Sequence, residues 1–442
     1  MNKPGRILLL TYYWPPAGGV AVQRWLSMSY YLANMGWAIE VITTGNPDYP
    51  YLDSKLQSKV HPNIKIHKVS GMEPRLWLKR LRSITGQSNT SENLDNMINN
   101  PDHKPGLMTR AIMWIRSNLF IPDARVGWAK AAGIYAIKQW GSSDFDYVIT
   151  TGPPHSTHLS GLRLRATWPT IRWIADFRDP WMEIEFFDHL NLTKAALKKH
   201  EQLEHDVLSK AHTVLTVSPS WARLFEKKGA VETAVIFNGY DHRDYKRRIE
   251  KKASSAFRVI HLGTWGQDRS VPAFFKALNE VADTNKRHCQ LEWAGILDPL
   301  VHEEMKKVFT SPYVHLVDHG FVAHQSAVAL SQEANVLLLI QNQAPKNIKG
   351  RIPAKCFEYM ASGQPLLLIG REDTDMADIV SKHPLGYFAA FDDDEAMRQH
   401  LKEIMNNQKP PHNQEELSIE WYSRKAQSEQ LHQLLMRKAD QS

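Results

Sequence analysis

The sequence predicts two α/β domains in tandem, each a doubly wound parallel sheet covered by helices. Short apolar runs alternate with longer amphipathic segments, the alternation occurs in two series, and a charged stretch separates them. Strands that alternate with helices form parallel sheets with helices on both faces. A length of 442 residues also exceeds what one hydrophobic core ordinarily serves, so two domains are expected.

The first series begins with the apolar run RILLLT, followed by a Pro/Gly turn and a helix. In that helix Val22, Trp25 and Leu26 recur at helical spacing, and Gly36 ends it. The strands expected in this series span 6–11, 38–44, 146–151, 170–177, 213–217 and 233–237.

The second series starts after a polar, highly charged stretch, 242–256, which has no apolar periodicity and indicates a solvated linker. Its expected strands span 257–263, 291–295, 314–317, 335–340 and 365–370. A final helix follows, with apolar positions Trp421, Leu431, Leu434 and Leu435. We assign residues 1–240 to the first domain, 241–256 to the linker and 257–416 to the second domain.

Composition narrows the class of protein. Cys289 and Cys356 form no CxxC pair, which argues against a disulfide framework and fits a reducing cytoplasm. We find no signal-peptide pattern and no apolar run near the ~18 residues that span a bilayer. A net charge of +7 favours an anionic partner, but no nucleic-acid motif or aromatic-interleaved basic stripe is present.

Two segments mix aromatic, aliphatic and basic residues: PRLWLKRLRS (74–83) and LMTRAIMWIRSNLFI (107–121). They flank a polar, breaker-rich loop at 84–106. Such segments can lie in the headgroup layer of a membrane or can pack as ordinary amphipathic helices. We expect a cytoplasmic protein that contacts the inner face of the membrane through these segments.

Two glycine-containing turns follow expected strands. In TYYWPPAGGVAVQRW, Gly18 and Gly19 leave room for a ligand, and the helix behind them can bind an anion through free N–H groups. In HLGTWGQDRS, Gly263 and Gly266 precede Arg269, which could pair with a phosphate. Neither turn is the GxGxxG pattern of a nicotinamide site. A plain tight turn and a surface charge remain the alternatives.

Charged and imidazole side chains follow two other strands. Asp176, Arg178 and Asp179 lie at the carboxyl end of a strand, where open α/β sheets bind ligands, or they form a local ion pair. His155 and His158 lie in GPPHSTHLS, but no HExxH pattern or supporting carboxylate accompanies them, so no metal site is expected.

The stretch RIPAKCFEYMASGQPLLLIG predicts a helix that begins at Pro353, ends at Ser362-Gly363 and precedes a buried strand. Lys355 lies in the first turn, where a cation opposes the helix dipole. An anion docked at this N-terminus would explain it, with Glu358 accepting hydrogen bonds from ribose hydroxyls. The alternative is an exposed Lys–Glu pair.

Taken together, these motifs resemble the family 4 retaining glycosyltransferases of the GT-B fold, especially the bacterial surface-polysaccharide branch that carries D-x-R-D-P-W. The matches occur in order along nearly the whole chain: PPAGGVAVQRW, IPDARVGW, TTGPPHSTHLSGL, WIADFRDPW, VLTVSPSW, VIFNGYD, HLGTWGQDR and IPAKCFEYMASGQPLLL.

The resemblance implies two Rossmann-like domains facing across a cleft, with a C-terminal helix (417–438) returning to the first. It implies a nucleotide-sugar donor on the second domain and an acceptor on the first. It implies that Gly18 and Gly19 approach the donor diphosphate, that Arg269 helps to neutralise it and that Glu358 holds the ribose. With our own candidates added, the predicted residues are a catalytic pair, a donor set and an acceptor side: Arg269 and Lys355; Gly18, Gly19, Gly263, Thr264, Pro353 and Glu358; His155, Asp176, Arg178 and Asp179.

The chain departs from the family pattern at several positions. Gly350 stands where many relatives have the first glutamate of the E-x7-E motif, and Ser270 stands where several have a second basic residue. The histidine often found near residues 150–152 is absent, and His155 lies a few residues later. Lys349 and Arg351 are candidates to replace part of the missing charge.

The predicted function is therefore metal-independent transfer of a sugar, without a cofactor, from a nucleotide-diphosphate donor to a hydroxyl. The expected acceptor is a lipid-linked saccharide in bacterial polysaccharide biosynthesis. Two alternatives stay open: a nucleotide-sugar epimerase of GT-B fold, and a non-catalytic protein that binds nucleotide-sugar or a partner.

Overall fold

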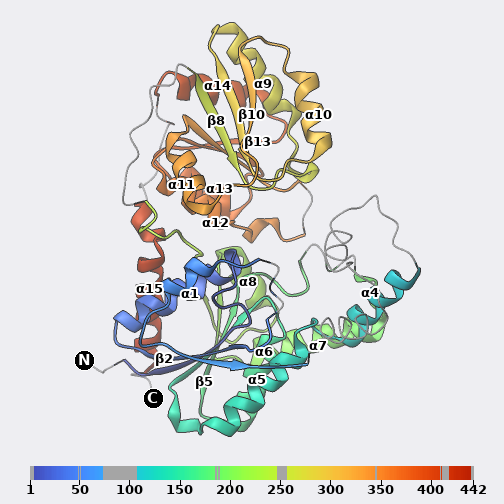
Figure 1. The fold of residues 1–442 in the computed structure, drawn as a ribbon, viewed down its shortest axis with the longest axis vertical. Helices are drawn as coiled ribbons and strands as arrows, with labels where there is room; N and C mark the ends of the chain where they lie inside the picture. Colours follow the sequence, from blue (N-terminus) through green and yellow to red (C-terminus); the bar gives the residue numbers. More distant parts are fainter. Residues whose placement is uncertain are drawn as a thin grey trace. The chain divides into compact units, whose positions relative to one another are not determined.

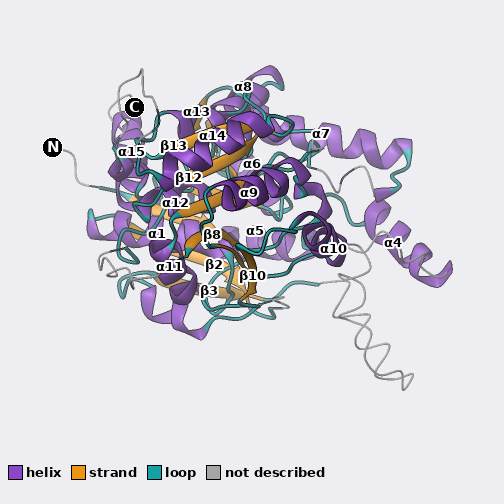
Figure 2. Ribbon diagram, turned by 90° about the horizontal axis from the view of Figure 1, so that it is seen from above, coloured by secondary structure: helices purple, strands orange, loops and turns teal. Residues whose placement is uncertain are grey.

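The computed structural model describes residues 4–47, 49, 51–72, 107–184, 187, 190–245, 256–343, 346–408, 410 and 418–439. The chain divides into two compact units. The first comprises 1–217, 221–236 and 432–442, and the second comprises 218–220 and 237–431. Each unit is built around one parallel sheet (Figures 1 and 2).

The first unit contains a seven-stranded sheet in the order β3-β2-β1-β4-β5-β6-β7. Its strands are β1 (Arg6–Leu10), β2 (Ala38–Thr44), β3 (Lys65–Val69), β4 (Tyr147–Gly152), β5 (Arg172–Phe177), β6 (Thr213–Thr216) and β7 (Thr233–Val235). The strand order reverses between β1 and β4, so the turns that follow these two strands diverge at their carboxyl ends. Such a switch point is where open α/β sheets bind ligands.

The helices of the first unit bury aromatic and small apolar side chains against the sheet. The core contains Trp128 and Ala132 of α5, Leu164 of α6, Val207 of α7 and Phe225 of α8. The bounds are α1 (Val20–Asn34), α4 (Leu107–Leu119), α5 (Val126–Gln139), α6 (Thr157–Thr167), α7 (Lys194–Lys210) and α8 (Pro219–Lys227), with short 3-10 helices η1 (Ser54–Lys59) and η2 (Ser142–Asp144).

The second unit contains a six-stranded sheet in the order β10-β9-β8-β11-β12-β13. Its strands are β8 (Phe257–Leu262), β9 (Cys289–Ala294), β10 (Val314–Asp318), β11 (Val336–Ile340), β12 (Leu366–Gly370) and β13 (Gly386–Ala390). The order reverses between β8 and β11, which gives this unit its own switch point.

Successive residues of the second unit's strands pack into two different cores. Val259, Leu338 and Leu367 belong to the core under α9, α10 and α14, whereas Ile260 and Leu368 belong to the core under α11, α12 and α13. This is the pattern of a sheet covered on both faces. The helices are α9 (Pro272–Thr284), α10 (Pro299–Val308), α11 (His324–Glu333), α12 (Ala354–Ala361), α13 (Asp375–Ser381) and α14 (Asp394–Met405), with η4 (Gln267–Arg269), η5 (Ile348–Gly350) and η6 (Ile419–Tyr422).

The C-terminal helix α15 (Arg424–Ala439) ends in the first unit. The Tyr147 hydroxyl of β4 donates to the Leu435 carbonyl at 2.6 Å, and the Trp37 indole N–H donates to His432 Nδ1 at 2.9 Å. Leu435 is fully buried. The expected return of this helix to the N-terminal half is confirmed.

The unit boundaries differ from the predicted domain limits. The crossing falls between Ile236 and Phe237, and the described part of the expected linker, 241–245, belongs to the second unit. Asp241 is buried and ion-paired with Arg243 at 2.6 Å, and Tyr245 packs on the second unit's core. In the described part of this stretch, Asp244 also lies 3.0 Å from His324 Nε2.

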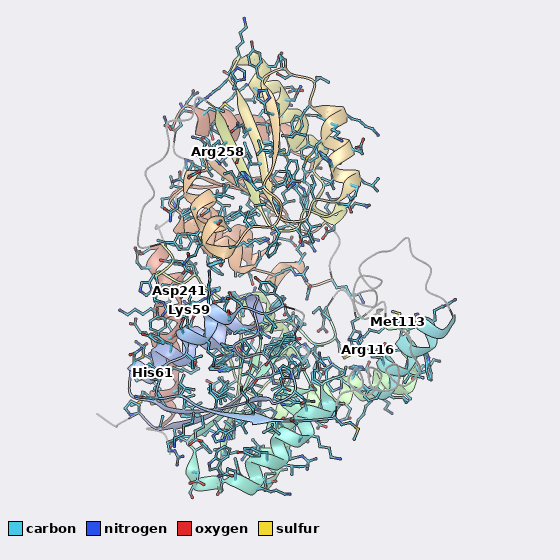
Figure 3. The ribbon with its side chains drawn as sticks, in the orientation of Figure 1. Lys59, His61, Met113, Arg116, Asp241 and Arg258 are labelled. Carbon is cyan, nitrogen blue, oxygen red and sulfur yellow. The ribbon has the colours of Figure 1, made fainter. Side chains whose placement is uncertain are left out.

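The two aromatic-basic segments have different outcomes. Segment 74–83 lies outside the described residues. Within 107–121 the structure has α4, which contacts α7 and is tied to its start because the Thr193 N–H donates to Asn118 Oδ1 at 2.7 Å. Figure 3 labels Met113 and Arg116 on this helix. No described helix is long and apolar enough to cross a bilayer.

Candidate functional site

In the second unit, the turn after β8 lies against the turn after β9. Gly263 has φ +104°, and its N–H donates to the Ala294 carbonyl at 2.7 Å. A side chain on Gly295, which has φ +137°, would place Cβ 2.6 Å from the Gly263 carbonyl carbon. Both positions therefore favour glycine: both have positive φ, and at Gly295 the backbone of Gly263 leaves no room for a Cβ atom.

Lys355 extends from the first turn of α12 to this glycine turn. A Cβ atom on Gly263 would overlap Lys355 Nζ, so the ammonium occupies the space that a side chain would need. Burial and, less strongly, the nearby charge of Arg269 lower the pKa of Lys355, Glu358 partly opposes them, and the resulting pKa is about 8. No described side chain gives Lys355 a hydrogen bond or a close ion pair. The site holds a half-buried cation that lacks a counter-ion in direct contact.

Arg269 is held in place by groups of the same switch point. Its Nε donates to Asn342 Oδ1 at 2.7 Å and its Nη1 donates to the Thr264 carbonyl at 2.9 Å. Asn342 follows β11, so this bond joins the turns after β8 and β11. The Trp265 indole N–H donates to the Arg269 carbonyl at 3.0 Å and fixes the backbone. Asp268 Oδ2 lies 3.7 Å from Arg269 Nη2.

Glu358 lies one turn beyond Lys355 on α12 and is half-buried. Its charge raises the pKa values of two neighbours, Tyr245 and His324. The larger cause differs for each: burial raises the pKa of Tyr245, and a hydrogen bond to Asp244 raises that of His324. His324 Nε2 lies 3.0 Å from Asp244 Oδ2.

Sequence reasoning missed Asp244, Tyr245 and His324 as neighbours of Glu358. The first two lie in the stretch interpreted as a linker, and His324 begins a helix without a motif. Helix α12 begins at Ala354, one residue later than predicted, so Pro353 is its N-cap and not its first residue. The Pro353 carbonyl accepts the Cys356 N–H at 3.0 Å. Lys349 forms an ion pair with Asp373 at 3.0 Å, so its charge is already partnered.

In the first unit, Gly18 and Gly19 serve different needs. A Cβ atom on Gly18 would overlap the ring of Tyr51. Gly19 is the N-cap of α1 with φ +85°, and an added Cβ there would meet nothing within 4 Å. The open backbone beside the α1 N-terminus is therefore at Gly19, whereas the ring of Tyr51 fills the space beside Gly18.

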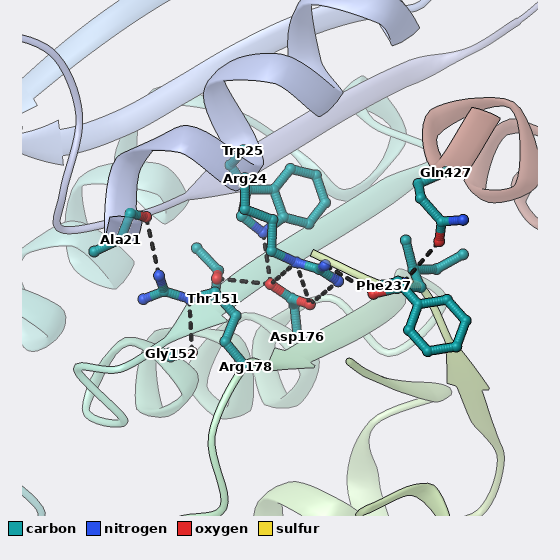
Figure 4. A network of polar contacts seen from close by, with 10 residues as sticks. Ala21, Arg24, Trp25, Thr151, Gly152, Asp176, Arg178, Phe237 and Gln427 are labelled. Carbon is teal, nitrogen blue, oxygen red and sulfur yellow. Dashed lines mark hydrogen bonds and ion pairs between the residues drawn. The ribbon is translucent and has the colours of Figure 1, made fainter. Parts of the chain in front are cut away.

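Asp176 forms the centre of a buried polar network (Figure 4). It accepts hydrogen bonds from Arg24 Nη2 at 2.9 Å, from the Trp25 indole at 2.6 Å and from the Thr151 hydroxyl at 2.8 Å. Arg24 also donates to the Ile236 carbonyl at 2.8 Å. Asp176 has no exposed surface, and its hydrogen bonds hold α1, β4 and β5 together.

Arg178 donates to three backbone carbonyls: Gly152 at 3.1 Å, Pro153 at 2.5 Å and Ala21 at 3.0 Å. Figure 4 shows it reaching from the end of β5 to the start of α1. Burial lowers its pKa, and the carboxylates of Asp179 and Asp176 oppose the shift. Arg178 thus joins the turns after β1, β4 and β5, while it and Asp179 remain only half-buried.

The two histidines after β4 converge on Gly152. A Cβ atom there would lie 2.7 Å from His158 Nε2 and 3.0 Å from His155 Nδ1. Burial lowers the pKa of His158 to about 3 and that of His155 well below its usual value, so both are neutral at pH 7. His155 is stacked on Trp181 with ring centroids 5.3 Å apart. Among the described residues, no group of three or more His, Cys, Asp or Glu side chains is placed to hold a metal ion.

No protein-family model and no curated protein sequence matches the chain. Solved structures do. Sucrose-phosphate synthase from Thermosynechococcus elongatus superimposes with a TM-score of 0.57 at 15% identity, over 99% of this chain and 100% of that one. A glycosyltransferase from Rickettsia africae gives 0.53 at 12% identity, over 100% and 98%. The lipopolysaccharide outer core galactosyltransferase WaaB gives 0.56 at 13% identity, over 98% and 99%.

The chain has the GT-B fold. The predicted fold class, two Rossmann-like domains with parallel sheets, is confirmed. Within the second unit of this GT-B chain, the structure brings together Gly263, Arg269, Lys355 and Glu358, with Thr264 and Pro353 adjoining them. Within the first unit, Arg178 connects the start of α1, beside Gly19, to the turn after β4 that carries His155; Asp179 lies next to it, and Asp176 lies in β5. Roles for these residues remain predictions.

The lowered pKa of Lys355 leads to a prediction about stability. Because the folded-state pKa lies below 10.5, the charged ammonium is disfavoured in the folded protein at pH 7. The Lys355→Met variant should therefore melt at a higher temperature than the wild type when no ligand is present. The difference should shrink between pH 8 and pH 10.5, where the folded wild type has lost this proton and the unfolded chain still holds it. Differential scanning calorimetry measures it.

Lys349→Met is the matched control, because Lys349 is exposed and paired with Asp373. It should change the melting temperature little, or lower it slightly. A lower melting temperature for Lys355→Met than for Lys349→Met at pH 7 would mean that Lys355 stabilises the fold through a partner.

Proposed function

We propose that this protein is a retaining glycosyltransferase that moves a sugar from a nucleotide-diphosphate donor to a hydroxyl group. One observation carries the proposal: a half-buried ammonium, Lys355, lies against the backbone of Gly263, close enough to Arg269 for the two charges to repel. Two neighbouring cations without a carboxylate bound between them form an unfavourable arrangement that a diphosphate would relieve.

The chemistry requires stabilisation of charge on the leaving group. As the bond between the anomeric carbon and the diphosphate breaks, negative charge grows on the diphosphate oxygens. Positioned cations stabilise that charge most strongly where water is scarce. Arg269 is held by Asn342 and Thr264, so it needs little reorganisation when the bond breaks. We propose that Lys355 and Arg269 perform the neutralisation for which other enzymes use a divalent metal.

The remainder of the donor would follow α12. Glu358 lies one helical turn past Lys355, and its carboxylate can accept hydrogen bonds from the two ribose hydroxyls. Because His324 is half-exposed and hydrogen-bonded to Asp244 beside Glu358, the nucleoside end would meet a polar, charged surface. Gly263 and Thr264 would present backbone to the diphosphate.

The acceptor is proposed to bind to the first unit. Arg178 and Asp179 are half-buried at the carboxyl ends of β4 and β5, which suits contact with hydroxyl groups. We propose a lipid-linked saccharide in bacterial polysaccharide assembly. The ordered motif resemblance supports this, as does the likeness in fold to a galactosyltransferase of lipopolysaccharide outer core.

The donor proposal predicts selective binding of one class of nucleotide. A thermal-shift screen against UDP-, GDP-, ADP- and TDP-sugars should raise the melting temperature with at least one of them, since a ligand that binds only the folded state stabilises it. Arg269→Ala and Glu358→Ala should each lower the affinity for that nucleotide-sugar by about tenfold or more. Product analysis with the same nucleotide-sugar then separates transfer from epimerisation, because an epimerase changes the sugar without an acceptor.

Arg371→Ala is the control for this screen. Arg371 is exposed and paired with Asp373 outside the proposed site, so its loss should leave nucleotide affinity within about twofold. Unchanged affinity in both Arg269→Ala and Glu358→Ala would show that the donor site has been misplaced.

Peripheral membrane contact is proposed through α4. Trp114, Ile115 and Leu119 are exposed on this helix, and so are Arg110 and Arg116. Exposed apolar side chains beside cations suit the headgroup layer of an anionic bilayer.

Co-sedimentation with liposomes tests the membrane contact. Binding should be stronger to vesicles containing anionic phospholipid than to neutral ones, and Trp114→Ser with Leu119→Ser should reduce it several-fold. The control is Leu197→Ser on α7, a leucine that is 39% exposed on a different helix. If liposome binding is the same with neutral and anionic lipid, and is unchanged by the α4 substitutions, the proposed membrane contact is wrong.

A further inference from the structure

A short strap, residues 51–56, lies across the glycine turn of the first unit. The Gly18 N–H donates to the Tyr51 carbonyl at 2.9 Å, and the Asp53 N–H donates to the Pro16 carbonyl at 2.8 Å. Between these bonds, Leu52 pairs with Ala17 as an antiparallel bridge. The strap and the turn therefore form a small two-stranded ribbon beyond the carboxyl end of β1.

The strap is also anchored to α1. Leu56 is 3% exposed and packs with Ala17, Val22 and Leu26 in a separate apolar cluster. The Asp53 carboxylate accepts the Lys55 N–H at 3.0 Å and so begins the 3-10 helix η1. These contacts hold the strap in one position relative to the start of α1.

The ring of Tyr51 is presented to solvent by this arrangement. It lies on Gly18, where a Cβ atom would overlap it, yet half of the residue remains exposed. The neighbouring residue, Gly19, has open space around its α-carbon. The strap therefore holds a half-exposed aromatic ring next to an open stretch of backbone.

The ring lies in the same region as the proposed acceptor groups. Arg178 donates to the carbonyl of Ala21, two residues after Gly19. Tyr13, which follows β1, lies near enough to Arg178 for its charge to affect the pKa of that guanidinium. Tyr13 in turn packs against Tyr49, two residues before Tyr51, with ring centroids 5.9 Å apart.

We propose that Tyr51 is a stacking platform for a sugar ring of the acceptor, which makes the acceptor's binding end a pyranose. This inference rests on the proposed function, because it specifies the acceptor of the same reaction. One face of a pyranose carries several C–H groups, which are weakly positive and apolar, and an aromatic face is negative. Hydroxyls at the edge of the stacked sugar would then be available to Arg178 and Asp179. Since the strap already fixes the aromatic ring, binding costs little side-chain entropy.

Saturation-transfer NMR with simple glycosides tests the platform. The probes are the methyl β-glycosides of glucose, galactose and N-acetylglucosamine, titrated into full-length protein. At least one should bind with saturation strongest on its ring C–H protons, and Tyr51→Ala should weaken it by about tenfold, while Tyr51→Phe stays within about twofold.

Leu52→Ala is the matched control, because Leu52 is the exposed neighbour of Tyr51 on the same strap. It should leave sugar binding unchanged, and melting curves should show that all three variants are folded. The proposal is overturned if no glycoside binds the wild type or if Tyr51→Ala binds it as well as the wild type does. It is also overturned if Leu52→Ala lowers the glycoside affinity as much as Tyr51→Ala does.

A thermal-shift titration with UDP, GDP, ADP and TDP on the same preparations separates this proposal from the general one. Sugar binding that depends on Tyr51 supports the platform even if no nucleotide binds. In that case the proposal that the protein is a glycosyltransferase fails. Nucleotide binding without Tyr51-dependent sugar binding leaves the donor site standing and removes the platform.

Discussion

The ammonium of Lys355, lodged against the α-carbon of Gly263, is the interaction on which the account of this protein depends. A Cβ atom at position 263 would overlap this ammonium, and the turn after β9 packs on the backbone of Gly263 through another glycine, Gly295. The interaction also places a cation in the first turn of α12, where the helix dipole opposes positive charge. An isolated protein gains nothing from this arrangement, whereas a protein that binds a diphosphate gains a positioned counter-charge.

The two units treat their switch points differently. In the first unit the charges are satisfied by the protein: Asp176 by Arg24, Trp25 and Thr151, and Arg178 in large part by backbone carbonyls. Such a saturated network fixes the loops that surround it. In the second unit, Arg269 is positioned, but no side chain in the described part of the chain forms a hydrogen bond or close ion pair with Lys355. The saturated network of the first unit suits a surface that binds an uncharged acceptor. The positioned cations of the second unit suit an anion site.

Much of the fold could be predicted because central strands are continuous apolar runs. The two strands that were not predicted, β3 and β13, lie at sheet edges. β3 has exposed and partly buried residues in its sequence KIHKV, so it lacks an apolar run, and β13 is a short GYFAA segment. The other edge strands, β7 and β10, were predicted, because the stretches 233–237 and 314–317 do contain apolar runs.

The site was predictable where a motif identified the residue and not where tertiary packing decided its role. Lys355 could be found because its charge contradicts its place on the helix. Asp176 was assigned to the acceptor side, but only the structure shows that Arg24 buries its carboxylate. Tyr51 and His324 belong to no motif, and their significance comes from the segments that fold against them.

The most direct test of the central claim is the number of protons taken up when the donor nucleotide binds. Calorimetry in two buffers of different ionisation enthalpy, with the nucleoside diphosphate that binds, measures it at pH 8. Because the pKa of Lys355 is about 8 in the free protein, a diphosphate that contacts the ammonium should raise that pKa and draw up to about half a proton, with none in Lys355→Met. Binding without proton uptake in the wild type, or equal uptake in Lys355→Met, would show that the diphosphate does not meet this ammonium.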